Sequence, residues 1–318
     1  MAQRVILDVD TGTDDAVALM LAVLHPDIEF VAATTVNGNV PLELTTENTL
    51  RVFDLLGESI PVHAGLAQPL VRHDFPRPRE DRSGHIDVHG RYLDIPPATS
   101  RPRDQGAVEF LIDTYMSTTD EIILVPTGPL SNVGAALSLE PRLADRIPEM
   151  VIMGGGHEVG NVTPSAEFNI WADPEAARVV LTSGVRRITL VPLDATHRAL
   201  VSLDDCAAMR ALGTPAGQAA AAFIERRIHG YDAGQPMDRP HSAPVHDALC
   251  VAAIVDRSII TTRRCHVDVE THGELTVGRT VIDTHRRGPH EPNADVAFDA
   301  DERRFAAMLL ETFARRLQ

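Results

Sequence analysis

The fold of this chain is decided near its start, by residues 4–24, RVILDVDTGTDDAVALMLAVL. Residues 4–7 form a short apolar run rich in β-branched side chains, which predicts a buried strand. Residues 16–24 predict a helix, which ends at His25-Pro26 because proline cannot continue it. The strand-to-helix turn between them carries four aspartates: Asp8, Asp10, Asp14 and Asp15.

The position of these carboxylates predicts a binding site. In open α/β sheets, ligands bind just beyond the carboxyl ends of the strands. Carboxylates gathered there repel one another unless a cation or shared protons compensate. We therefore expect a site for a hard cation with oxygen ligands. The alternative is that aspartates cap the helix N-terminus, which accounts for one or two of the four but not for Asp10 together with Asp15.

Outward from this turn, strand-like and helix-like segments alternate. Strands are predicted at 28–36, 60–62, 121–125, 150–153 and 188–191, and a hairpin at 266–281 that turns at His272-Gly273. Helices are predicted at 42–56, 108–116, 174–181, 203–212, 215–228, 247–255 and 301–317, and a long polar loop, a candidate lid, at 65–105. This alternation predicts an α/β fold with an open, mostly parallel sheet and helices on both faces. Without repeats or linkers, residues 1–318 are expected to form a single domain.

Composition excludes several function classes. The formal charge of −16 and the pI near 5.2 make the chain a poor partner for nucleic acid. Every basic residue is arginine, which excludes Schiff-base lysines, a P-loop lysine and a lysine general base. Three scattered cysteines, Cys206, Cys250 and Cys265, indicate a reducing compartment. With neither a signal-peptide pattern nor a membrane-length apolar run, we expect a soluble cytoplasmic protein.

Three further segments carry polar groups that suit ligand binding or catalysis, and they follow predicted strands. Residues 125–132 (VPTGPLSN) offer a turn carbonyl that suits a hard cation, or an ordinary turn before a helix. Residues 161–169 (NVTPSAEFN) offer amides and a carboxylate that suit a polyhydroxy ligand such as a sugar, or a polar loop with Asx turns. Residues 244–247 (PVHD) open an apolar helix. Asp247 either caps this helix, or binds a metal while His246 acts as an acid beside the substrate.

Together these motifs resemble the inosine-uridine-preferring nucleoside hydrolase family, the calcium-dependent nucleoside N-ribohydrolases. The matching segments occur in family order over most of the chain: 8–16, 37–39, 126–132, 153–156, 161–169, 171–176 and 246–247. The opening aspartate motif is the most specific of them, and the glycine run 154–156 is the weakest. The resemblance implies a Rossmann-like nucleoside hydrolase fold, a nucleoside substrate and a homotetramer or homodimer.

The resemblance also implies roles for individual residues. A calcium ion would be held by Asp10, Asp15, the backbone carbonyl of Thr127, and Asp247, together with a water and the ribose 2′ and 3′ hydroxyls. Asp10 would take a proton from that water as it attacks C1′, and His246 would supply a proton to the leaving base. The substrate-binding residues would be Asp14, Asn39, Met153, Asn161, Glu167 and Asn169. Such carboxylates favour a transition state with oxocarbenium character.

One stretch departs from the family pattern. Family members usually carry a His-Gly-x-x-Gly-Leu-like run in the loop after the third strand, whereas residues 83–91 here read SGHIDVHGR. That loop closes over the base, so the base preference stays open. Tyr231 and His241 are further candidates to reach the base, with solvated loop residues as the alternative.

Two other classes compete with this interpretation. Asp8-x-Asp10-x-Gly12 resembles the signature of haloacid-dehalogenase-like phosphatases. That class normally needs a later lysine or arginine beside the phosphate, whereas this chain has no lysine and no arginine in a matching motif. The phosphatase interpretation also leaves residues 161–169 unexplained. The second class is a non-catalytic nucleoside- or sugar-binding protein on the same scaffold. Released base, released phosphate, or binding without turnover would distinguish the three.

Overall fold

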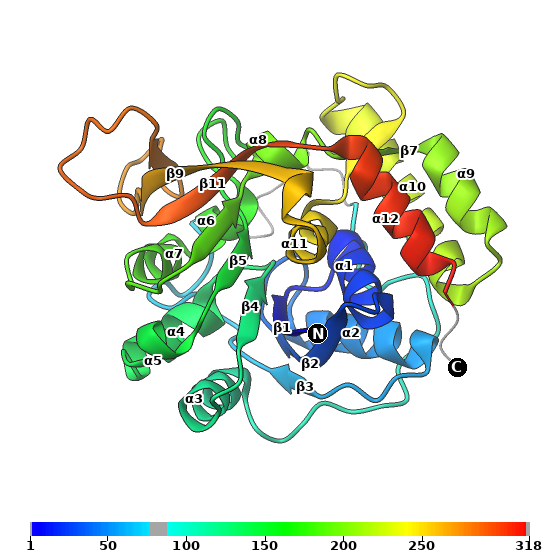
Figure 1. The fold of residues 1–318 in the computed structure, drawn as a ribbon, viewed down its shortest axis with the longest axis horizontal. Coiled ribbons are helices and arrows are strands. Elements are labelled where there is room, and N and C mark those ends of the chain that lie inside the picture. The colour runs from blue at the N-terminus through cyan, green and yellow to red at the C-terminus, as the bar shows by residue number, and fades with distance from the viewer. Residues whose placement is uncertain (1, 77–87, 316–318) are drawn as a thin grey trace.

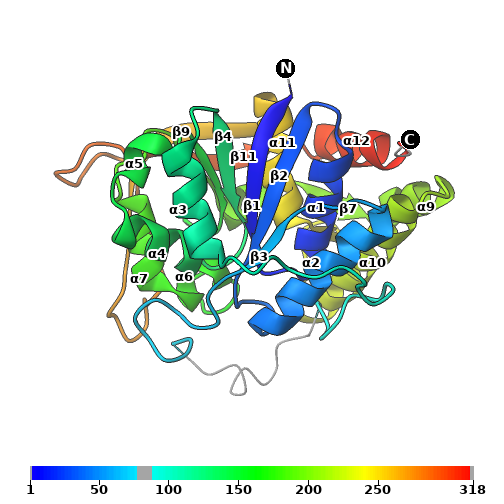
Figure 2. The ribbon, with the colours of Figure 1, turned by 90° about the horizontal axis from the view of Figure 1, so that it is seen from below.

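A nine-stranded sheet crosses the centre of the computed structural model, which describes residues 2–76 and 88–315 (Figure 1, Figure 2). In spatial order its strands are β10 (Thr280–Asp283), β9 (Ile260–Val269), β11 (Ala294–Ala300), β6 (Ile188–Val191), β5 (Met150–Met153), β4 (Ile122–Pro126), β1 (Gln3–Val9), β2 (Ile28–Thr35) and β3 (Val62–Ala64). All neighbouring pairs from β11 to β3 are parallel, and β9 is antiparallel to both of its neighbours. The predicted open, mostly parallel α/β sheet is confirmed.

The strand order contains a topological switch point between β1 and β4. From β1 the chain first builds β2 and β3 on one side, and then crosses over to build β4, β5 and β6 on the other. Crevices at such switch points bind ligands in doubly wound sheets. The two strands end in register, with Asp8 opposite Pro126, and the Thr127 amide donates to the Asp8 carbonyl at 2.8 Å. The turns after β1 and β4, which contain Asp10 and Thr127, therefore lie side by side.

Helices cover both faces of this sheet (Figure 2). One face carries α1 (Thr13–Leu24), α2 (Leu42–Leu56), α10 (Pro215–Gly234), α11 (His246–Val255) and α12 (Glu302–Phe313). The other carries α3 (Ala107–Ser117), α4 (Ser131–Leu139), α5 (Leu143–Arg146) and α7 (Pro174–Leu181). The remaining elements are α6 (Phe168–Ala172), α8 (Leu193–Thr196), α9 (Leu203–Ala211), a 3₁₀ turn (Arg257–Ile259) and the strand pair β7 (Leu200–Ser202) and β8 (Ser242–Pro244).

Helix α1 is enclosed by the rest of the fold on every side, which accounts for the continuous apolar run after its polar first turn. All of its residues except Val23 are buried, and it packs along α11 (Figure 1). It begins at Thr13, one turn earlier than the apolar run 16–24 predicts. The Asp15 carboxylate accepts a 2.9 Å hydrogen bond from the Gly12 amide, so a capping role for this aspartate is present. Asp14 and Asp15 therefore belong to the helix itself, at its electropositive end.

Several boundaries differ from the sequence-based prediction. Strand β3 begins at Val62 rather than at residue 60, and α12 ends at Phe313. Helix α10 runs to Gly234 instead of residue 228, so Tyr231 is a buried helical residue and not part of a loop. The predicted hairpin is present as β9 and β10 but β9 starts at Ile260. Strand β11 was missed.

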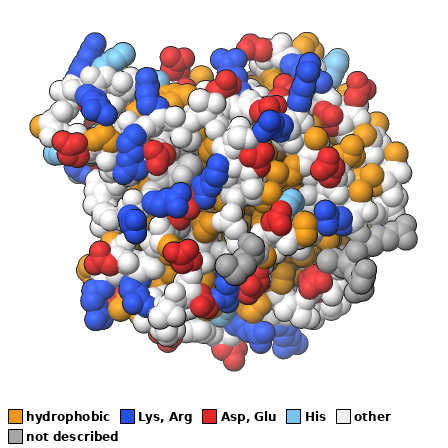
Figure 3. Space-filling view, in the orientation of Figure 1, with side chains coloured by type: hydrophobic (Ala, Val, Ile, Leu, Met, Phe, Trp, Pro, Cys, Tyr) orange, Lys and Arg blue, Asp and Glu red, His pale blue; other side chains and the backbone are white. Residues whose placement is uncertain are grey.

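On the surface, acidic and basic side chains are interspersed over the face seen in Figure 3, without a continuous basic stripe. None of the helices within the described ranges has the length and hydropathy that crossing a membrane requires. The three cysteines are all buried and unpaired, as their scattered spacing predicts.

Candidate active site

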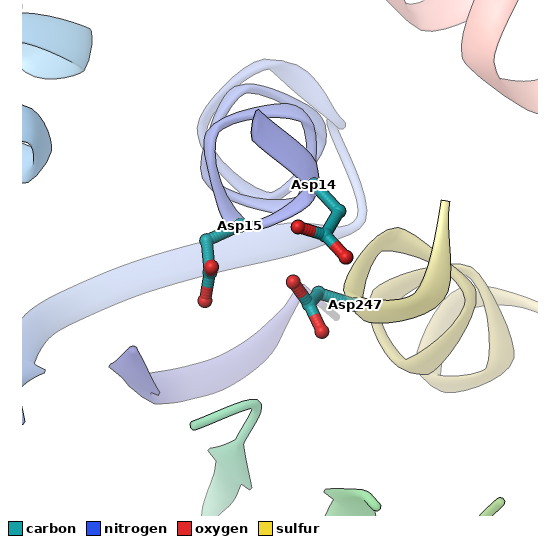
Figure 4. Close-up of side chains that lie close together, drawn as sticks. All are labelled: Asp14, Asp15 and Asp247. Atoms are coloured by element: carbon teal, nitrogen blue, oxygen red, sulfur yellow. The ribbon is translucent and has the colours of Figure 1, made fainter. Parts of the chain in front are cut away.

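Three carboxylates meet at the point where α1 and α11 begin (Figure 4). Asp14 and Asp15 lie in the first turn of α1 and Asp247 in the first turn of α11, and one oxygen from each lies within 4.8 Å of the others. All three side chains are buried. Two helix N-termini stabilise negative charge here, but they do not neutralise three carboxylates. The arrangement suits a divalent cation with oxygen ligands.

Asp10 and Thr127 lie next to this cluster, in the adjacent turns after β1 and β4. The backbone amide of Asn39 donates to the Asp10 carboxylate at 2.6 Å, and the Thr127 hydroxyl donates to the Asp15 carboxylate at 3.0 Å. Gly38 permits this contact, because a Cβ atom there would lie 1.9 Å from an Asp10 oxygen. Of the four predicted metal ligands, Asp15 and Asp247 belong to the cluster itself, while Asp10 and Thr127 lie beside it. The third carboxylate of the cluster is Asp14, which was predicted to bind the substrate.

The fourth aspartate of the opening motif has a different environment. Asp8 is fully buried within β1, where its carboxylate accepts hydrogen bonds from the Thr34 hydroxyl at 2.6 Å and the Asn132 amide at 2.8 Å. Burial raises its pKa to about 6. Asp8 therefore ties β1 to β2 and to the start of α4 and is not a member of the cluster.

Burial and mutual repulsion dominate the electrostatics of the cluster. Burial, reinforced by the Asp15 charge, raises the pKa of Asp10 well above its usual range. Burial and the Asp14 charge raise the pKa of Asp15 to about 7, and the same two causes raise the pKa of Asp247. A bound divalent cation opposes each of these causes because it stabilises the ionised carboxylates. The donor set fits a hard cation, since the cluster contains no histidine or cysteine ligand among the described residues.

A cavity of about 620 Å³ opens beside this cluster. Its lining includes nine of the eleven predicted site residues: Asp14, Asn39, Thr127, Met153, Asn161, Glu167, Asn169, His246 and Asp247. The other two, Asp10 and Asp15, are buried beneath it. A cavity of this size, with polar groups on one side, suits a small polar ligand.

The segment 161–169 forms the polar wall of the cavity. Glu167 caps α6 and accepts hydrogen bonds from the Asn169 amide at 2.9 Å and the Gly155 amide at 2.8 Å. The Asn169 side chain donates to the Thr127 carbonyl at 2.7 Å and also contacts the Met153 sulfur at 3.3 Å. These bonds fix the wall relative to the cation cluster. A carbonyl oxygen has two lone pairs, so Thr127 retains acceptor capacity for a cation.

His246 lies at the cavity wall with both ring nitrogens engaged. Its Nε2 is 2.7 Å from the Tyr231 hydroxyl, and its Nδ1 is 2.7 Å from the Thr196 hydroxyl. Burial, with the nearby positive charge of Arg227, lowers the pKa of His246 well below its usual range. Burial raises the pKa of Tyr231 to about 12, so this phenol keeps its proton at neutral pH.

Comparison with known proteins decides the family. The model of the family described as inosine-uridine preferring nucleoside hydrolase matches residues 5–307. The chain belongs to this family. This nucleoside hydrolase is 38% identical over 318 residues to the inosine-uridine preferring nucleoside hydrolase of Leishmania major, covering 99% of this chain and 98% of the relative. It is also 38% identical over 285 residues to the pyrimidine-specific ribonucleoside hydrolase RihB of Escherichia coli strain SE11, covering 88% and 87%.

Solved structures agree with the family assignment. A purine-preferring ribonucleoside hydrolase from Gardnerella vaginalis is similar to this nucleoside hydrolase with a TM-score of 0.89 and 32% identity, covering 98% of each chain. A plant nucleoside hydrolase, PpNRh1, is similar with a TM-score of 0.88 and 29% identity, covering 99% of each chain. The predicted enzyme class, hydrolysis of the N-glycosidic bond of ribonucleosides, is confirmed, and the phosphatase alternative is not supported.

The loop that departs from the family pattern reaches the site of this nucleoside hydrolase. Residues 83–87 lie outside the described residues, but Val88, His89, Gly90 and Arg91 line the cavity. The His89 Nδ1 accepts a 3.2 Å hydrogen bond from the Thr13 amide and lies 3.7 Å from Asp14. His241, by contrast, is exposed, is bonded to Asp232 at 2.9 Å and does not line the cavity, so its surface-loop interpretation is confirmed.

Arg227 is a site residue that the sequence analysis missed. It lies on α10, is only 1% exposed, lines the cavity, and contacts Asp14 at 3.0 Å. A signal for it was present in the sequence. Ala220, Ile224, Arg227 and Tyr231 recur at helical spacing and share the buried face of α10. An arginine on an apolar helix face indicates a buried partner.

Proposed function

We propose that this chain is a Ca²⁺-dependent ribonucleoside hydrolase in which Asp10, Asp15, Asp247 and the Thr127 carbonyl hold the cation. The observation that carries the proposal is the buried cluster of Asp14, Asp15 and Asp247, which lies beside Asp10 and Thr127 and opens onto a cavity of about 620 Å³. Calcium is favoured over softer metals because every donor is oxygen. It is favoured over magnesium because its flexible coordination shell accommodates several protein oxygens at once.

When bound, the cation would orient a water and lower its pKa. Asp10 would then remove the proton from this water as the oxygen attacks C1′ of the ribose. Asp10 suits this role because the backbone amide of Asn39 fixes one of its oxygens and leaves the other free to accept the proton. Asp14, Asn39, Glu167 and Asn169 would bind the sugar hydroxyls, Asn161 would bind the 5′ hydroxyl, and Met153 would pack nearby.

The departing base develops negative charge, and we assign its stabilisation to the His246–Tyr231 pair. His246 is neutral at pH 7 because its pKa is lowered, so it holds no spare proton by itself. The Tyr231 hydroxyl, 2.7 Å from its Nε2, holds one. The pair can therefore stabilise the base through a hydrogen bond from the Tyr231 hydroxyl at the cavity wall, with His246 holding the phenol in position.

Further features of the proposal follow from family membership and composition. Relatives named as pyrimidine-specific and as purine-preferring both match this chain, so we propose a ribonucleoside substrate without restriction to one class of base. We also propose a homotetramer or homodimer and a role in purine or pyrimidine salvage. The three free cysteines favour the cytoplasm as its location.

A substrate panel with chelation tests the proposal. Purified protein is incubated with inosine, uridine and ribose 5-phosphate, first as isolated, then after prolonged chelation, and then with Ca²⁺ restored. We expect free base and ribose from the nucleosides, loss of turnover on chelation and recovery with Ca²⁺. Asp15→Ala should abolish turnover, whereas Asp204→Ala, in the exposed first turn of α9, should not. Full activity in metal-free protein would refute the cation site, and release of phosphate would favour the phosphatase alternative.

A further inference from the structure

Arg227 occupies a position that its own burial makes costly. Its side chain is 2% exposed and lies among the carboxylates of the cluster. Burying a guanidinium requires that its charge and its donors are matched. Its Nη1 lies 3.0 Å from the Asp14 carboxylate and donates to the Thr13 hydroxyl at 3.3 Å, and its Nε donates to the Pro244 carbonyl at 3.0 Å. Roles in sugar binding or proton transfer do not account for this set of contacts.

These contacts connect the two segments that supply the carboxylates. Thr13 and Asp14 lie in the first turn of α1, and Pro244 ends β8 directly before the segment with His246 and Asp247. One guanidinium on α10 therefore holds both segments at fixed positions. The planar fork of arginine suits this task, because its donors point in different, fixed directions.

Asp14 lies where it could bind either of two ligands, the cation or the sugar of the substrate. One of its oxygens belongs to the carboxylate group that could hold a cation, and the residue also lines the substrate cavity. The contact with Arg227 is an ion pair rather than an aligned hydrogen bond, and the paired oxygen, Oδ1, accepts no aligned hydrogen bond within the described part of the chain. It therefore retains acceptor capacity for a ligand hydroxyl, while the adjacent guanidinium charge opposes a cation at the same oxygen.

We propose that Arg227 is a positioning residue that keeps Asp14 out of the cation shell and reserves it for the sugar. This inference rests on the proposed cation site and nucleoside substrate. Loss of Arg227 should therefore have opposite effects on Ca²⁺ binding and on nucleoside hydrolysis. Without Arg227, Asp14 becomes an additional carboxylate ligand, so Ca²⁺ binds more tightly while nucleoside hydrolysis is lost.

Calorimetric titration of chelated protein with Ca²⁺ tests the inference without relying on turnover. We expect Arg227→Met to raise Ca²⁺ affinity by about tenfold or more, because ligand charge count sets affinity at such sites. In an Asp14→Asn background the same substitution should raise affinity less, since it still removes the nearby guanidinium charge but releases no additional carboxylate ligand. Arg210→Met, which breaks the partly exposed ion pair with Glu225, removes an equal charge and should leave affinity unchanged.

Asp14→Asn alone provides a second variant that conserves shape and is expected to fold. If Asp14 serves the sugar, this variant should weaken Ca²⁺ binding only modestly, through the Arg227 charge that it leaves uncompensated, because no cation ligand is lost. It should raise KM for inosine strongly. Asp15→Asn, the matched change at a cation ligand, should instead weaken Ca²⁺ binding severely.

Each result supports or overturns the inference. Weaker or unchanged Ca²⁺ binding in folded Arg227→Met would overturn it, as would an equal gain in both Asp14 backgrounds. Equal losses of Ca²⁺ affinity in Asp14→Asn and Asp15→Asn would show that Asp14 is a cation ligand, and would overturn it even if Arg227→Met fails to fold. Absence of Ca²⁺ binding by the unmodified protein would refute the proposed cation site, and this inference with it.

Discussion

Replacement of Glu167 by glutamine is expected to change the pH dependence of stability by an amount that the structure sets. Burial raises the pKa of Glu167 from 4.5 to about 7. Because the folded protein holds this proton more tightly than the unfolded chain, the group stabilises the fold fully below its unfolded pKa. That stability is lost as the pH rises from about 4.5 to about 7. At about 1.36 kcal/mol per pKa unit, the complete loss is about 3.4 kcal/mol.

The part of this stability that is lost between about pH 5 and about pH 8 is about 2.5 kcal/mol, since an unfolded glutamate is already mostly ionised at pH 5. Glu167→Gln removes the titration. It also destabilises the fold at every pH, because both Glu167 oxygens accept backbone amides and a glutamine offers only one oxygen. The variant should therefore show a large deficit at pH 5 that shrinks by about 2.5 kcal/mol at pH 8.

Urea unfolding of chelated protein at the two pH values measures this difference directly. Glu158→Gln, an exposed glutamate in the neighbouring loop, is the control and should leave the pH profile of the parent unchanged. Parallel profiles for the parent and Glu167→Gln would refute the reasoning, because they would show that the buried carboxyl ionises in the folded protein as it does in the unfolded chain.

Further predictions concern the chemistry of the site. Asp10→Asn keeps an oxygen for the cation but loses the base, so steady-state assays should show turnover reduced by about a hundredfold or more with better-preserved substrate binding; a near-normal rate would assign the base elsewhere. His246→Ala should severely slow inosine hydrolysis yet barely affect p-nitrophenyl riboside, whose leaving group needs no proton; equal losses on both would mean that His246 only shapes the site. Gly38→Ala should inactivate the enzyme because its Cβ would displace the Asp10 carboxylate, whereas Gly106→Ala, where the nearest atom is 3.7 Å away, should be active; retained activity in Gly38→Ala would show that this turn yields.

Local pattern in the sequence predicted the elements that local interactions determine. Helix α2, helix α7 and strands β5 and β6 begin and end at the predicted residues, since apolar spacing and terminating residues such as Gly57 specify them. Helix α10 exceeds its predicted end because tertiary burial of Gly230 and Tyr231 outweighs the tendency of glycine to end a helix. Short segments such as α8 and β7 depend on packing and left no periodic signal.

The candidate site was predictable where residues of one chemical type recur in a motif. The opening aspartates and the segment 161–169 pointed to the right end of the sheet, and the structure brings them together with Asp247. Pairings between distant segments were not predictable in the same way. The contact of Tyr231 with His246 and that of Arg227 with Asp14 depend on how α10 docks beside α1 and α11, which no local pattern specifies.

The carboxylate group joins parts of the chain that are synthesised far apart in time. Asp14 and Asp15 are synthesised well before Asp247, which lies on a helix that packs along α1. No nascent fragment that lacks α11 can bring these oxygens together, so a cation held by them would enter late in folding and would link α1 to α11. Its release would loosen α1 from α11 first, and amide hydrogen exchange in these two helices should be the earliest to rise when the protein is chelated.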